Sequence, residues 1–213
     1  MDSPPDDDRR NGLDRVKERV ADGLNEIVTY IEVTGATKIL RRYFAMNAFD
    51  GAMTSLGVVM GAYLSHIHEP RSIMGVILTS GIAMMISGFS GTYMTESAER
   101  SHSLNELEDA MLVNLDDTLY GRASRFVSAF AALVDGSAPF IAALPSLVPF
   151  LMVPGMFSIE TGYMASAAAS LTTLFTLGIY LGRISGENIL VYGLKMVVAG
   201  AVVALIALVL NIH

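Results

Sequence analysis

Long apolar segments separated by polar stretches dominate the pattern of this chain. Five of them reach the length of about 20 residues that a helix needs to cross a bilayer, and they cover 44–65, 73–94, 126–150, 160–182 and 188–210. Prolines at 139, 145, 149 and 154 predict that the third segment kinks or ends early, with a partly buried loop over 147–158. We therefore expect an all-α integral membrane protein with five transmembrane helices, two within 43–93 and three within 126–213.

Two polar stretches flank the first pair of segments. Apolar residues recur at helical spacing over 12–33, at Leu13, Val16, Val20, Leu24, Ile27 and Ile31. This spacing predicts an amphipathic helix that lies on the membrane or packs on a cytoplasmic loop. The cytoplasmic helical region is expected over 12–42, after a disordered acidic N-terminus over 1–11. The stretch 94–125 predicts an acidic cytoplasmic helical insertion between transmembrane helices 2 and 3.

The distribution of charge orients the chain. All but one of the 14 Lys and Arg residues fall on one side of the predicted spans, and Arg71 is the exception. The positive-inside rule then places the N-terminus in the cytoplasm and the C-terminus outside it. The acidic N-terminus has no apolar segment of the kind that a signal peptide requires.

Composition narrows the classes of function. Only 16% of the residues are charged, whereas soluble domains carry nearer a quarter. A net charge of −7 argues against nucleic acid as a partner and mildly favours cations. The chain has no cysteine, so disulfides and thiolate metal sites are excluded. No catalytic triad, phosphate loop or dinucleotide fingerprint is present, so we expect neither an enzyme nor a bound cofactor.

Asp50 is the strongest candidate for a functional residue. It interrupts the first apolar segment, where an unpaired charge costs on the order of 3 kcal/mol. On a helical wheel it shares a face with Thr54, Gly57 and Gly61, and a GxxxG pair lets another helix approach closely. Asp50 should therefore point into protein, where it binds a cation or a proton. The alternative is a structural carboxylate that is protonated or paired with a buried base.

A second acid and a small-residue stripe extend this interpretation. Asp135 stands in an Asp-Gly pair like that of Asp50-Gly51. Asp135 is a second candidate ion ligand, and the alternative is that the repeated pair arose by chance. The second segment places Met84 and Ser87 on a face of small and hydroxyl residues. Such a face usually serves helix packing, but it can line a cation path in which the Met thioether is a soft ligand.

Acidic residues continue below the second segment. The candidates for metal capture on the cytoplasmic side are Glu96, Glu99, His102, Glu106 and Asp109. Glu99 and His102 stand one helical turn apart, a spacing that di-metal carboxylate bundles use. Oxygen ligands with one nitrogen suit Fe(II), Mn(II) or Zn(II). The alternative is a solvated acidic helix without a ligand.

These features together resemble the vacuolar iron transporter family over roughly 40–211. The resemblance rests on the five-span plan, the Asp50-Gly51 pair with Thr54 and Gly61, and the acidic insertion. It also rests on the run Ser87-Gly-Phe-Ser-Gly-Thr-Tyr93-Met-Thr-Glu-Ser-Ala-Glu99, which is similar to the family pattern Ser-Met-x-x-Gly-Glu-Tyr-x-Ser. The family Met is Gly88 here and the family Glu is Thr92, so Met84 is the expected substitute for the Met.

The resemblance implies a homodimeric, proton-coupled transporter that exports Fe(II) or Mn(II) from the cytoplasm across the bilayer. It implies that Asp50 and a second-span Met bind the ion and that acids of the insertion gather it. Asp135, Ser87 and Thr54 are the expected supporting residues. Because the family Met and Glu are replaced, the alternative is a membrane-embedded scaffold or sensor that binds metal without moving it.

Overall fold

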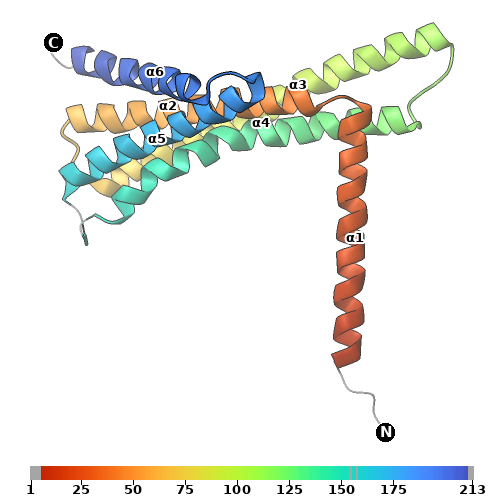
Figure 1. Cartoon of the computed structure of the whole chain (residues 1–213), viewed down its shortest axis with the longest axis horizontal. Helices are drawn as coiled ribbons and strands as arrows, with labels where there is room; N and C mark the ends of the chain where they lie inside the picture. The colour runs from red at the N-terminus through yellow and green to blue at the C-terminus, as the bar shows by residue number, and fades with distance from the viewer. Residues whose placement is uncertain (1–5, 154, 157, 211–213) are drawn as a thin grey trace. The chain divides into compact units, whose positions relative to one another are not determined.

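All regular secondary structure in the described part of this computed structural model is α-helical. The structure describes residues 6–153, 155–156 and 158–210, with side chains at position 19 and from 21 onward. The helices run in the order α1 (Asp6–Val33), α2 (Thr37–Leu64), α3 (Pro70–Met111), α4 (Leu119–Leu151), α5 (Ile159–Ser185) and α6 (Ile189–Leu210) (Figure 1). The expected all-α class is confirmed for these residues.

Four of the described helices, α3 to α6, are long and apolar enough to cross a membrane. The chain is therefore membrane-embedded. The predicted first span, 44–65, falls within α2, whose apolar run is interrupted by Asn47 and Asp50. A fifth span, and with it the orientation of the termini, remains a prediction.

The N-terminal helix differs from its predicted bounds. It begins at Asp6, so residues 6–11, for which disorder was predicted, are helical, and residues 1–5 lie outside the described part. The region predicted as one helical unit over 12–42 is divided by a turn at 34–36, where Gly35 adopts a φ of 62°. Glycine takes this left-handed conformation without the steric cost that a side chain brings, and α2 starts directly after it.

The prolines do not end α4 early. The helix continues through Pro139, Pro145 and Pro149 to Leu151, so the loop predicted over 147–158 is wrong for its first five residues. Pro154 lies outside the described residues. Membrane helices tolerate proline because neighbouring helices and local adjustments satisfy the freed carbonyls, and both Pro139 and Pro149 are buried.

The chain divides into two compact units. The first comprises Met1–Lys38 and Ser97–Phe130, and the second Ile39–Glu96 and Ala131–His213. Within the first, the Tyr30 ring of α1 lies 5.4 Å from the Phe126 ring of α4. The Tyr30 hydroxyl donates a hydrogen bond to Glu26, and this bond raises the pKa of Tyr30 above its ordinary value.

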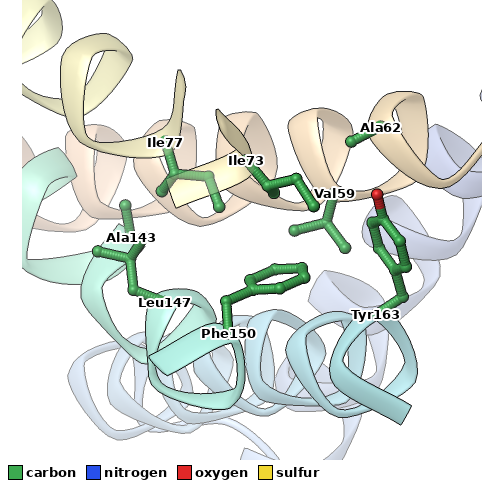
Figure 2. Close-up of a cluster of buried hydrophobic side chains, with 8 residues drawn as sticks. All are labelled: Val59, Ala62, Ile73, Ile77, Ala143, Leu147, Phe150 and Tyr163. Atoms are coloured by element: carbon green, nitrogen blue, oxygen red, sulfur yellow. The ribbon is translucent and has the colours of Figure 1, made fainter. Parts of the chain in front are cut away.

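The second unit contains the main hydrophobic core. Buried residues of α2, α3, α4 and α5 meet in one cluster around Phe150, made of Val59, Ala62, Ile73, Ile77, Ala143, Leu147, Phe150 and Tyr163 (Figure 2). The Tyr163 hydroxyl donates to the carbonyl of Ile67 at 2.5 Å and so ties the α2–α3 connection to α5. This packing holds α2, α3, α4 and α5 against one another.

Candidate functional site

A column of polar side chains runs along the junction of α2, α3 and α4, entirely within the second unit. We call it the polar column, and it consists of Tyr43, Asn47, Thr92, Glu96 and Asp135. Tyr43 and Asn47 are four residues apart on α2, and Thr92 and Glu96 are four apart on α3. Residues at this spacing lie one above the other on a helix, so each helix has two polar side chains on the face that meets the other helices.

Asp135 of α4 is the centre of the polar column. The residue is only 4% exposed. Its Oδ2 accepts a hydrogen bond from Thr92 Oγ1 at 2.6 Å, and its Oδ1 accepts one from Asn47 Nδ2. Two donors from two different helices hold the carboxyl group in one orientation.

The backbone at Asp135 adds a further oxygen. Pro139 stands four residues later in the same helix and has no N–H, so the Asp135 carbonyl cannot receive its usual intrahelical hydrogen bond. A carbonyl freed in this way is a good oxygen ligand for a cation or an acceptor for a proton donor.

Asp50 lies close enough to Asp135 for the two carboxyl groups to interact electrostatically. In contrast to Asp135, it is exposed on the single chain. Within the described part of the chain no hydrogen bond or ion pair engages it. Lys195 does not neutralise it either, since its Nζ lies 4.9 Å from the centre of the Tyr192 ring. One acid is therefore buried and held by two donors, and the other is exposed and within electrostatic range of the first.

Gly88 explains how Asp135 comes so near to α3. A Cβ atom at this glycine would lie 3.1 Å from the Gly136 Cα and 3.2 Å from Asp135 Oδ2. The Asp135 carboxylate therefore occupies space that a larger residue at position 88 would need. Position 88 is where the family resemblance expects methionine, so in this chain a carboxylate oxygen stands near the place of the expected thioether.

The other predicted transport residues are less directly engaged. Met84 is partly buried one turn before Gly88, Thr54 is partly buried on α2, and Ser87 is exposed on α3. Among the described residues no hydrogen bond engages the Met84 sulfur or the Thr54 and Ser87 hydroxyls. Among the described residues the structure records no polar contact between either acid and these three residues, and the two acids themselves interact only electrostatically.

The predicted capture residues do not form one group. Glu96 is 5% exposed and accepts a hydrogen bond from the Tyr43 hydroxyl at 2.7 Å, so it belongs to the polar column. Glu99, His102, Glu106 and Asp109 are exposed, and the described residues contain no set of three His, Asp or Glu arranged to hold a metal. His102 pairs with Glu106 at 3.5 Å instead of with Glu99.

Sequence reasoning missed Asn47 and Tyr43, and it treated Thr92 only as a departure from the family pattern. The signal was present in the spacing, because Tyr43, Asn47 and Gly51 recur every four residues on α2, as Gly88, Thr92 and Glu96 do on α3. Each series joins polar residues to a glycine that permits close approach. A pairing of the two series would have pointed to the polar column.

Comparison with known proteins gives one informative relative. The chain is 29% identical over 192 residues to the uncharacterised protein MJ0645 of Methanocaldococcus jannaschii, an alignment that covers 88% of this chain and 95% of that protein. No family model matches the chain. No solved structure matches it. The likeness therefore extends over almost the whole length of both chains and carries no assigned activity.

Proposed function

We propose that this protein is a proton-coupled transporter that exports a divalent transition metal, Mn(II) or Fe(II), from the cytoplasm. The observation that carries the proposal is the buried Asp135 at the junction of α2, α3 and α4, with Asp50 exposed on α2 within electrostatic range of it. Acidic residues inside membrane proteins are rare and usually serve ions or protons. Two neighbouring carboxylates repel each other until a divalent cation or a proton lies between them.

We propose the polar column as the route by which a cation reaches these two acids. Glu96 with Tyr43 lies at one end of it, and Asp135 with Asn47 and Thr92 lies beyond. A cation that enters past Glu96 meets oxygen donors before it reaches Asp50. Protonation of Asp50 from the opposite side then removes one negative charge from the pair and releases the cation, which couples the two movements.

The donor atoms favour Mn(II) over Fe(II) as the ion. Asp50 and Asp135 supply hard oxygen donors, and Asp135 stands near the place where the resemblance expects a thioether sulfur. Carboxylate and carbonyl ligands suit Mn(II), whereas a thioether suits softer ions. The soft-ligand role predicted for Met84 is accordingly the weaker part of the sequence-based hypothesis.

The exposed position of Asp50 favours a homodimer. Asp50 and Met46, which is 59% exposed, lie on the face of α2 opposite its buried residues. A carboxylate that faces acyl chains is costly, and a second copy packed on this face would remove it from lipid. We propose that two copies bring their Asp50 side chains together across this face.

A flux measurement tests the function. The purified chain is reconstituted in liposomes, and Mn(II) uptake is followed with and without a pH gradient. We expect Asp50→Asn to lower the gradient-driven flux by about tenfold or more, since a lost charge-assisted contact is worth about 1.5–3 kcal/mol. Asp117→Asn, an exposed acid of the α3–α4 loop, is the matched control and should transport like the parent.

The second candidate is a membrane-embedded metal-binding scaffold or sensor. The observation that favours it is the absence, among the described residues, of a group of three metal-ligating side chains. Saturable Mn(II) binding to the reconstituted protein, with no flux in either direction and no response to a pH gradient, would select this candidate. Equal flux in Asp50→Asn and the parent would remove Asp50 from the transport mechanism.

A further inference from the structure

A separate cavity lies in the first unit, between the part of α3 that follows Glu96 and the beginning of α4. Its volume is about 100 Å³. Its lining is mostly polar and includes Arg100 and Asn105 from α3 and Ser124 and Arg125 from α4. Asp116, from the connecting loop, is the one acid among the residues that line it. The cavity therefore offers mainly hydrogen-bond donors.

Ser124 contributes a hydroxyl to the lining. Ser124 as a whole is only 4% exposed, and in the described part of the chain its hydroxyl makes no hydrogen bond. None of the described residues has a fully buried side-chain oxygen or nitrogen without a partner, so this hydroxyl is accessible from the cavity and can donate to a group bound there. Nearby, Gly121 leaves no room for a Cβ against the carbonyl of Leu115, which lets the loop close tightly over this end of the cavity.

Asp116 orients the Arg125 side chain and leaves several of its N–H donors unused. Its Nη1 lies 3.3 Å from Asp116 Oδ1, and its Nη2 donates to the Asp116 carbonyl at 2.9 Å. A guanidinium carries five N–H donors, so these two contacts orient the group and leave three donors. Arginine in this state matches the geometry of a phosphate group, which accepts several hydrogen bonds at once.

The position of the cavity along the helices suggests the source of such a group. The predicted spans end near 94 and begin near 126, and a helix rises 1.5 Å per residue. Residues 97–101 and 124–128 then lie within about 10 Å of the edge of the hydrocarbon, the depth of lipid headgroups. Basic pockets between membrane helices at this depth bind anionic headgroups.

We propose that this cavity binds a phosphate group, supplied by an anionic phospholipid headgroup. Arg100, Arg125 and the Ser124 hydroxyl donate to the phosphate oxygens, and Asp116 keeps the Arg125 guanidinium in the orientation for binding. The proposal rests on the membrane placement of α3 and α4 and is independent of metal transport. Its test can therefore fail while the transport proposal stands, and the reverse also holds.

Native mass spectrometry of the full chain in detergent tests the site. Dioleoyl phosphatidate is the probe, and dioleoylglycerol, which lacks the phosphate, is the control lipid. We expect Ser124→Val and Arg100→Gln each to reduce bound phosphatidate by about tenfold, because each removes a donor to a charged acceptor. Ser103→Val and Arg122→Gln, exposed residues outside the lining, are the matched controls and should bind like the parent.

The results divide as follows. In one outcome, inorganic phosphate binds and depends on Ser124 and Arg100, whereas phosphatidate does not bind. This outcome supports the phosphate site and identifies the free anion as its ligand. Equal retention of phosphatidate by the parent and both cavity variants overturns the proposal. If dioleoylglycerol binds as well as phosphatidate, or if Arg122→Gln loses as much bound phosphatidate as Arg100→Gln does, the proposal is also overturned. The cavity would then hold only water. Thermal unfolding of each variant confirms that it is folded.

Discussion

At the scale of single residues, the two acids of the site differ in how they are held. Asp135 has two fixed donors and is buried, whereas Asp50 is exposed on the single chain and none of the described residues bonds to it. A ligand that stays in place and a ligand that changes partner are both needed when an ion is exchanged for a proton. In the proposed transport cycle, Asp135 takes the first role and Asp50 the second.

The hydroxyl of Thr92 can be removed with little change in shape. Thr92→Val leaves one oxygen of Asp135 without its donor, and we expect a loss of about 1–3 kcal/mol in stability, the cost of an unsatisfied buried polar group. The free energy of unfolding in detergent is the measurement. Thr95→Val is the control, since the Thr95 hydroxyl donates only to carbonyls of its own helix. An equal loss in both variants would show that the bond to Asp135 contributes nothing of its own.

Asp135 and Met84 can be compared as second ligands. If oxygen has replaced sulfur, Asp135→Asn should lower Mn(II) flux by about tenfold or more, and Met84→Leu should leave it within about twofold. Uptake into liposomes measures both variants against the parent. A large loss in Met84→Leu with normal flux in Asp135→Asn would restore the thioether hypothesis that the sequence suggested.

At the scale of elements, close helix contact brings the site residues together. A Cβ at Gly51 of α2 would overlap the backbone of Pro139 in α4, and a Cβ at Gly136 of α4 would lie 2.7 Å from the Met85 carbonyl of α3. Neither obstacle is a flexible side chain. The three helices can approach this closely only because glycine stands at each contact.

The contact at Gly51 yields a direct test. Gly51→Ala forces α2 away from α4, and we expect it to lower the melting temperature and to weaken Mn(II) flux, since Asn47 then no longer reaches Asp135. Gly61→Ala is the matched control on the same helix, because a Cβ there meets nothing within 4 Å. Unfolding temperature and flux are measured for both. A normal melting temperature in Gly51→Ala would contradict the proposed contact.

Sequence patterns predicted the elements well and the site in part. Long apolar runs identified the membrane-embedded class, and the strong cost of an acid in such a run singled out Asp50 and Asp135. The pairing of Asp135 with Thr92 and Asn47 was missed, because 43 and 88 positions separate the partners and one helix alone does not show which face meets which. The loop predicted from position 147 was wrong for a similar reason, since neighbouring helices compensate for the hydrogen bonds that Pro145 and Pro149 remove, and α4 continues to Leu151.

The same limit explains the residues predicted to capture metal. These four acids and one histidine share a stretch of sequence, yet Glu96 belongs to the polar column with Tyr43, while Glu99, His102, Glu106 and Asp109 stay exposed. Spacing alone could not separate a buried acid from solvated ones, because the partner of Glu96 comes from another helix.

At the scale of the whole molecule, the proposed mechanism requires a cover for Asp50. Among the described contacts α6 lies near α2 at Gly57, where a Cβ would lie 3.9 Å from Val203, and not at Asp50. The face that carries Met46 and Asp50 is therefore open. A two-fold related copy presents the same face and can cover it, since such interfaces are self-complementary.

The natural absence of cysteine makes this arrangement easy to test. Met46→Cys places a single thiol on the open face of α2, and Val76→Cys places one on α3, where the side chain is 52% exposed. In liposomes under mild oxidation we expect a disulfide-linked dimer from Met46→Cys and monomer from Val76→Cys, because a disulfide forms only when the two Cα atoms come within about 7 Å. Reduction should return the Met46→Cys dimer to monomer. Cross-linking of equal yield at both positions would indicate random collision in the bilayer, and monomer at both would leave Asp50 without the proposed cover.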